Sequence, residues 1–168
     1  MNAALHQVVP CVITKKVRRF CEQLAPSQIP VYIPVRPEAQ AVELECYGNV
    51  LEKVRTSGGE CVYGWEISEV PQIFLEAQFH AVWRSPDGEL VDVTPPQIEA
   101  QRVLFLPDPG RVYEGVKVAN QRFAIGNAAL AERYWKLSDH LIERFSSFEI
   151  GLPGLRVSQL RRNESYSL

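Results

Sequence analysis

Three side chains of this 168-residue chain have the types and the order that nucleophilic catalysis requires: Cys46, His80 and Asp92. A cysteine thiolate attacks a carbonyl carbon, an imidazole accepts and returns the proton, and a carboxylate orients the imidazole and stabilises its charged form. Because the thiolate is the nucleophilic species, a catalytic cysteine needs a helix N-terminus or a nearby imidazolium to favour that state. We interpret the three residues as a candidate nucleophile, base and orienting group.

Cys46 begins a segment with helical spacing, residues 46–55, and two glycines at positions 58 and 59 end it. The N–H groups of a first helical turn have no partner within the helix, so those beside Cys46 are candidate oxyanion donors. Gly48 leaves room for a substrate backbone to approach closely. The apolar face predicted for this helix consists of Val50, Leu51 and Val54.

His80 and Asp92 fall on the two strands of a predicted hairpin. The residues Pro86-Asp87-Gly88 between the strands are typical of a tight turn. If these three residues form the loop, Asp92 pairs with Val82 and His80 pairs with Thr94. His80 and Asp92 then share one face of the hairpin as diagonal neighbours, within reach of each other. A change of one residue in the turn would put them on opposite faces.

The elements that must position these residues follow from hydrophobic periodicity. Helices are predicted over residues 12–24, 46–55 and 128–145, and strands over residues 60–67, 71–84, 89–93 and 102–106. The last helix is predicted to be capped by Asn127 and to carry an apolar stripe of Leu130, Ala131, Tyr134, Trp135, Leu141, Ile142 and Phe145. The proline-rich residues 27–37 predict an extended edge segment, and residues 112–123 a short irregular strand pair. This order of elements predicts an α+β fold, with a helix packed on an antiparallel β-sheet.

The length of the chain predicts a single domain over residues 1–168. We divide it into an N-terminal helix and extended segment (1–40), a region with the three chemical residues (41–96), and C-terminal strands and a helix (97–168). A net charge of −2 gives no electrostatic reason to expect nucleic acid or an anionic membrane as a partner. Because the N-terminus has no secretory pattern and no apolar run reaches the roughly 20 residues of a membrane span, we expect a cytoplasmic protein.

The four cysteines are Cys11, Cys21, Cys46 and Cys61. None forms a CxxC pair, so neither a zinc ribbon nor a thioredoxin-like motif is predicted. Free thiols are the default in a reducing cytosol, and we interpret Cys21 and Cys61 as small buried packing residues. We predict no cofactor and no metal, although Cys46, His80 and Asp92 are of types that can bind one.

Residues 46–95 resemble the core of the transglutaminase-like superfamily. The resemblance consists of a cysteine at a helix start, a V-Y-G-W strand, the sequence H-A-V-W, a turn, and L-V-D-V-T-P. It implies a papain-like α+β fold and amide hydrolysis or acyl transfer through a thioester, with Cys46 as nucleophile, His80 as base and Asp92 as orienting group. Tyr47, Gly48 and Asn49 replace the acidic residues usual after the cysteine in that family, and the chain beyond residue 96 matches no part of it.

We therefore predict a cysteine-dependent amide hydrolase, peptidase or acyl transferase that acts on a small-molecule, peptide or protein amide. The residues expected to bind the substrate are Tyr47, Gly48, Trp65 and Gln78. Core packing is the alternative for Trp65. The alternative function is a non-catalytic ligand- or protein-binding module on the same scaffold. The two functions differ at Cys46, which is reactive in an enzyme and buried or unreactive in a binding module.

Overall fold

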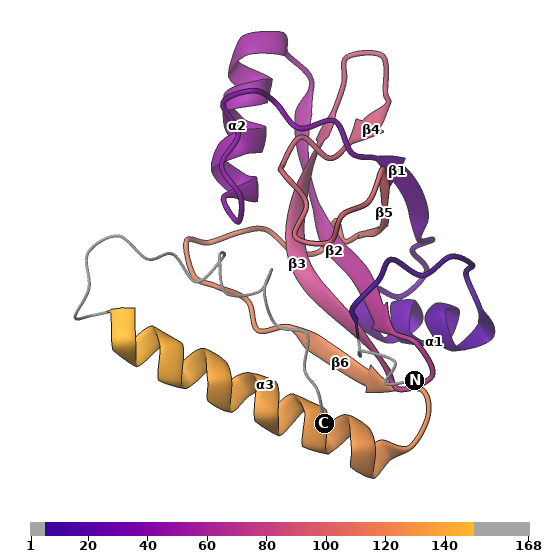
Figure 1. Ribbon diagram of the computed structural model, residues 1–168. Helices are drawn as coiled ribbons and strands as arrows, with labels where there is room; N and C mark the ends of the chain where they lie inside the picture. The colour runs from indigo at the N-terminus through magenta and orange to yellow at the C-terminus, as the bar shows by residue number, and fades with distance from the viewer. Residues whose placement is uncertain (1–5, 150–168) are drawn as a thin grey trace.

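The structure is a computed structural model that describes the backbone of residues 6–149 and the side chains of residues 6–140. Its elements in chain order are α1 (Lys15–Leu24), β1 (Val31–Pro34), α2 (Cys46–Ser57), β2 (Glu60–Val70), β3 (Phe74–Arg84), β4 (Leu90–Val91), β5 (Arg102–Pro107), β6 (Gln121–Ala124) and α3 (Ala128–Glu149). The six strands form one sheet, and every paired ladder in it is antiparallel. The predicted class, α+β with helices packed on an antiparallel sheet, is confirmed (Figure 1).

The sheet curls until its first and last strands meet. Its strand order is β1-β5-β2-β3-β4, and β6 pairs with β3 beyond this path. Val35, directly after β1, forms a bridge with Asp92, directly after β4. The Asp92 N–H donates to the Pro34 carbonyl at 3.0 Å, and the Arg36 N–H donates to the Asp92 carbonyl at 2.8 Å. These two bonds connect the opposite edges of the sheet.

The inner face of the curled sheet has an apolar core to which every strand of the main path contributes. Its buried residues are Ile33, Val82, Val103 and Phe105, and Val35, Val62 and Leu90 pack against them. Side chains alternate between the two faces of each strand. The inner positions of β2 and β3 therefore also include Gly64, Glu66, Gln78 and His80, which follow the apolar residues towards the β2–β3 turn.

The outer face is covered by helices at different positions along the long β2–β3 hairpin (Figure 1). The helix α1 is capped by Thr14, whose hydroxyl oxygen accepts a hydrogen bond from the Val17 N–H. It packs its buried residues Val17, Phe20 and Cys21 against Trp65, Ile67, Leu75, Ala77, Phe79, Leu104 and Leu106. The helix α2 packs its buried residues Cys46 and Val50 against Ala81, Val91 and Val93. Among the described residues, none of the helices is both long enough and apolar enough to cross a membrane.

Several local predictions are wrong or only partly right. Leu51 is 56% exposed, because α2 packs on the sheet through Cys46, Tyr47, Val50 and Val54, a face that does not include Leu51. Residues 112–120 form no strand, and only residues 121–124 of the predicted pair form β6.

In α3, the Asn127 side chain accepts from the Leu130 N–H at 3.2 Å, as predicted for a cap. Leu130 itself is 40% exposed, so it does not belong to the packed stripe. Ala131, Tyr134 and Trp135 do pack around Phe74. The predicted positions Leu141, Ile142 and Phe145 lie outside the described side chains.

Gly64 on β2 is required by the close approach of β5. A Cβ atom at this position would lie 2.2 Å from the carbonyl oxygen of Leu106 and 2.6 Å from the ring of Phe105. These distances are shorter than van der Waals contact, and the nearer atom belongs to the backbone. A side chain at position 64 would therefore push β5 away from β2.

We expect Gly64→Ala to lower the free energy of unfolding by about 1–3 kcal/mol, the usual cost of overpacking a core. Gly48→Ala is the control, because nothing lies within 4 Å of its Cβ position and it sits inside a helix. That variant should be stabilised by roughly 0.5–1 kcal/mol. Denaturant unfolding measures both effects, and equal stabilities of the two variants would contradict the assignment.

Candidate active site

His80 and Asp92 lie in contact on the inner face of the sheet. The ladder between β3 and β4 pairs Trp83 with Val91 and Arg84 with Leu90, and the Ser85 N–H donates to the Glu89 carbonyl around a three-residue loop. Extended by three residues beyond the end of the ladder, this register would align His80 with Thr94, as predicted. The Nε2 atom of His80 is 3.0 Å from Oδ2 of Asp92. The predicted hairpin register and the shared face are confirmed.

The Asp92 carboxylate is held on both of its oxygens. Oδ1 accepts from the Thr94 N–H at 2.9 Å, and Oδ2 faces His80. The Asn49 side chain donates from Nδ2 to the Thr94 hydroxyl at 3.2 Å and to the Val42 carbonyl at 2.8 Å, while its Oδ1 accepts from the Val42 N–H at 2.9 Å. Asn49 thus connects the segment before α2 to the strand that carries Asp92.

Cys46 is the first residue of α2 and is 6% exposed. The preceding residue, Glu45, makes no side-chain capping bond, and the first intrahelical bond runs from the Asn49 N–H to the Glu45 carbonyl. The first-turn N–H groups beside the thiol therefore have no partner within the helix. The Cys46 thiol lies close enough to the His80 ring to contribute to the raised pKa of His80.

An open edge in the sheet explains how Cys46 and His80 meet. The β3–β4 ladder ends at Trp83 and Val91, because Asp92 pairs with β1 instead. At the open edge of β3, the Tyr47 hydroxyl donates to the Phe79 carbonyl at 3.2 Å. The first turn of α2 therefore sits on this edge, where a thiol from the outer side reaches an imidazole from the inner side.

Burial and charge act in opposite directions on His80. Burial alone lowers the pKa of His80, since it disfavours the imidazolium. The charge and hydrogen bond of Asp92, the hydrogen bond of Cys46 and the charge of Glu66 outweigh it, so the pKa of His80 is well above its ordinary value. These interactions favour the imidazolium form of the ring.

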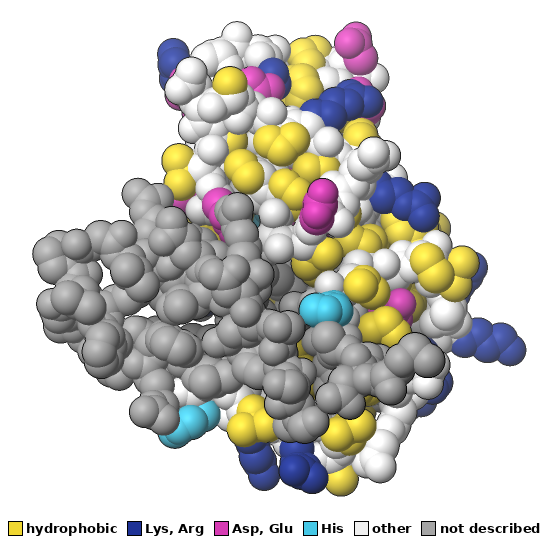
Figure 2. Space-filling model, in the orientation of Figure 1, with side chains coloured by type: hydrophobic (Ala, Val, Ile, Leu, Met, Phe, Trp, Pro, Cys, Tyr) yellow, Lys and Arg dark blue, Asp and Glu magenta, His cyan; other side chains and the backbone are white. Residues whose placement is uncertain are grey.

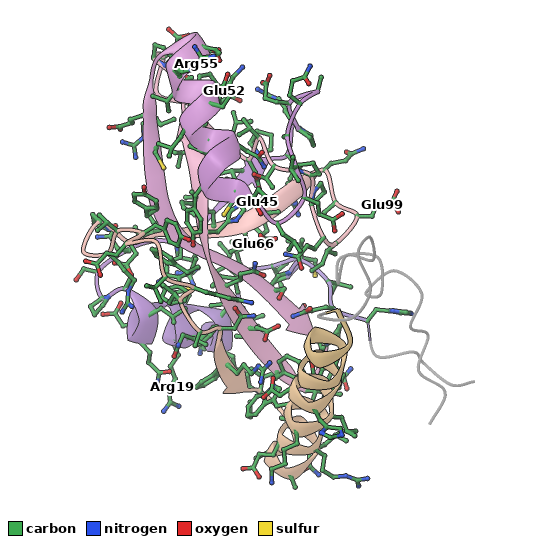
Figure 3. All side chains as sticks on the ribbon, turned by 90° about the vertical axis from the view of Figure 1, so that its left-hand side faces the viewer. Arg19, Glu45, Glu52, Arg55, Glu66 and Glu99 are labelled. Atoms are coloured by element: carbon green, nitrogen blue, oxygen red, sulfur yellow. The ribbon has the colours of Figure 1, made fainter. Side chains whose placement is uncertain are left out.

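Glu66 is a second carboxylate on the same ring, and the sequence analysis missed it. Its Oε2 is 4.0 Å from Nδ1 of His80, and its side chain is 19% exposed. Burial raises the pKa of Glu66. Figure 3 labels Glu66 on the sheet. The available signal was the period of two in β2, which puts Glu66 on the same face as Gly64, the residue paired with His80.

Glu66, His80 and Asp92 are also residues of the types that bind a metal ion, with ligand atoms within 4.8 Å of one another. A cation can bind only one nitrogen of the ring. Asp92 lies against Nε2, whereas Glu66 lies nearest to Nδ1 at the other edge. The arrangement is better suited to holding a proton on His80 than to coordinating one ion.

Three of the four residues predicted to bind substrate lie near this site. Tyr47 is half-buried and stacks on Tyr113, with 3.6 Å between ring centroids and 5° between ring planes. Gly48 is exposed in the first turn of α2. Gln78 shares the inner face with His80 and lines a cavity of about 540 Å³. Other residues lining this cavity are Glu66, Ser68, Glu76, Gln97 and Glu99.

Trp65 does not line this cavity, and its prediction as a substrate-binding residue is wrong. It is 1% exposed and points to the outer face, where it packs in the core beneath α1. Its indole N–H donates to Oδ2 of Asp108 at 3.0 Å. The alternation of β2 gives Trp65 the opposite face from Glu66, so core packing is its role.

The other cysteines differ from Cys46 in their surroundings. All four thiols are free. Cys21 is buried under α1, and burial raises its pKa to about 11. Burial also raises the pKa of Cys61, which packs beside the Cys46 cluster. The interpretation of Cys21 as a buried packing residue is confirmed. Cys11 is exposed and provides a reference thiol.

No family model, no curated protein and no solved structure matches this chain. The structure itself shows an α+β domain in which helices pack on a curled antiparallel sheet. The resemblance of residues 46–95 to the transglutaminase-like superfamily stays a prediction.

We expect Glu66→Gln to lower the pKa of His80 towards its ordinary value of about 6.5, because removing a nearby negative charge destabilises the imidazolium. NMR titration of the ¹⁵N-labelled imidazole measures the change. Glu69→Gln is the matched control, since Glu69 is on the same strand but at an outer-face position. An unchanged His80 titration in Glu66→Gln would show that Glu66 exerts no charge effect on the ring.

The raised pKa of His80 also predicts how stability depends on pH. A group whose pKa is higher in the folded than in the unfolded state stabilises the fold when it is protonated. For His80, this stabilisation is complete below about pH 6.5 and is lost as the pH rises through the folded-state pKa. The difference in unfolding free energy between the parent and His80→Asn should therefore shrink as pH is raised above 6.5. Denaturant unfolding across this range tests the sign, and a constant or growing difference contradicts it.

Proposed function

We propose that this protein is a cysteine-dependent amide hydrolase or acyl transferase on a papain-like scaffold, with Cys46 as nucleophile. The observation that carries the proposal is the buried His80, which has Asp92 at 3.0 Å from Nε2 and a pKa raised in part by the nearby Cys46 thiol at the start of α2. A thiol at a helix start, an imidazole and an orienting carboxylate are the parts needed to generate and use a thiolate.

The proposed reaction begins from a Cys46 thiolate beside the His80 imidazolium. The sulfur attacks the amide carbonyl carbon, and first-turn N–H groups of α2 stabilise the oxyanion that forms. The imidazolium gives its proton to the leaving amine as the C–N bond breaks, which leaves a thioester on Cys46. Water or a second nucleophile then attacks the thioester while His80 takes the incoming proton, and the thiolate is released.

Asp92 and Asn49 have supporting roles in this proposal. Asp92 holds Nε2 and leaves Nδ1 for the sulfur and the leaving group. Asn49, through Thr94, fixes the distance between the strand of Asp92 and the start of α2. The exposed Gly48, with nothing within 4 Å of its Cβ position, offers a substrate backbone an approach to the first turn.

The second candidate is a non-catalytic binding module on the same scaffold. Two observations support it. Cys46, His80 and Asp92 are 6%, 5% and 2% exposed, so the three groups are covered. Glu66 adds a second negative charge beside the imidazolium, which opposes deprotonation of His80 and also disfavours a thiolate nearby. In such a module, the buried charges would fix the conformation of the sheet edge and not take part in a reaction.

Alkylation of the individual cysteines by iodoacetamide, measured by mass spectrometry at pH 6, separates the two functions. For an enzyme we expect Cys46 to be labelled at least about tenfold faster than the exposed Cys11, since a thiolate reacts where an ordinary thiol of pKa about 8.5 does not. In His80→Ala, this advantage should be lost. Buried Cys21 should stay unlabelled in both proteins, which reports that they remain folded.

If Cys46 reacts no faster than Cys11 and His80→Ala changes nothing, the catalytic proposal is wrong and the binding module is favoured. If Cys46 is activated, a screen with amide and ester libraries follows. Cys46→Ser serves as the inactive control. Accumulation of a mass adduct on Cys46 would identify the thioester and the acyl group of the substrate.

A further inference from the structure

We propose that α1 and the segment around the end of β6 form a binding site for a phosphate group, separate from the candidate active site. A cavity of about 350 Å³ lies between these elements. It is lined by Lys15, Lys16 and Arg19 from α1 and by residues 123–126. It shares no lining residue with the polar cavity next to His80.

The charge of this cavity is positive and uncompensated. Three of its seven lining residues are cations, and none is acidic. Within residues 6–140, no ion pair includes Lys15, Lys16 or Arg19. In the space-filling view, dark-blue Lys and Arg side chains project from the edge of the molecule where α1 lies (Figure 2).

Two of the three cations are held in position by contacts that leave their charge available. The Lys16 ammonium donates to the Ile125 carbonyl, and the Arg19 guanidinium lies 5.9 Å from the centre of the Phe123 ring. Arg19 projects outward from α1 near β6 (Figure 3). Since both are fixed by a carbonyl dipole or an aromatic ring, the side chains are preorganised around the cavity without an acid to neutralise them.

The position of these cations along α1 is a second, independent reason to expect an anion. The helix begins at Lys15 and has no acidic residue in its first turn. The N-terminal end of a helix carries partial positive charge, so cations there are unfavourably placed and an anion is favourably placed. A bound anion would interact well with both the cations and the helix end.

Phosphate fits this cavity better than a carboxylate does. A phosphate dianion has enough charge and enough acceptor oxygens for two or three cations at once, and arginine and lysine are its usual partners. The volume also leaves room for a substituent, and the wall formed by Phe123, Ala124 and Ile125 is apolar. The ligand class is therefore inorganic phosphate or a small phosphomonoester.

The test is an NMR titration of the full ¹⁵N-labelled chain with inorganic phosphate and with phenyl phosphate at low ionic strength. We expect saturable shifts of the amides of residues 15–19 and 123–126. Lys15→Ala and Arg19→Ala should each weaken binding by about tenfold, as expected for the loss of one charge-assisted hydrogen bond. Arg18→Ala is the matched control, because Arg18 is exposed on the same helix but does not line the cavity.

Arg18→Ala should change the affinity by less than about twofold. Tighter binding of phenyl phosphate than of phosphate would support a phosphomonoester in contact with the apolar wall, and equal binding would support phosphate itself. Shifts that do not saturate, or an equal loss of affinity in Arg18→Ala, would mean diffuse attraction to a basic helix and would overturn the proposal. The absence of shifts would also overturn it. Neither result depends on the reactivity of Cys46.

Discussion

The placement of Asp92 is the constraint on which the rest of the site depends. Its backbone leaves the β3–β4 ladder and bonds instead to Pro34 and Arg36, which joins the two edges of the sheet. The same departure exposes the edge of β3 that α2 covers, and it turns the carboxylate towards His80. The closure of the sheet, the edge on which α2 lies and the contact with the imidazole thus all meet at Asp92.

The local half of this arrangement could be predicted from the sequence. The turn Pro86-Asp87-Gly88 determines the register of the hairpin, and the register determines that His80 and Asp92 share a face. The start of α2 at Cys46 follows from helical spacing and from the glycines that end the helix. Each of these inferences uses interactions between residues close in the chain, where dihedral preferences and side-chain periodicity are strong.

The non-local half could not be predicted. The bridge between Val35 and Asp92 joins segments 57 residues apart, and no periodicity encodes such a closure. The alternation of side chains along β2 puts Trp65 and Glu66 on opposite faces of the sheet. Because both faces are covered, this alternation does not show which face has the candidate site. Glu66 was therefore missed and Trp65 was misassigned. Leu51 is a similar case. The amphipathic pattern of α2 indicates which side of the helix faces the sheet, but it does not determine how many residues of that side are buried.

The hydrogen bonds of Asn49 affect how the candidate site unfolds locally. They connect the chain ahead of Cys46 to Thr94, which in turn holds Asp92. A local opening of the first turn of α2 would release the thiol and the support of the carboxylate in one event, because both depend on the same amide. We therefore expect the nucleophile and the orienting group to open together, as parts of one cooperative unfolding unit with the same opening free energy.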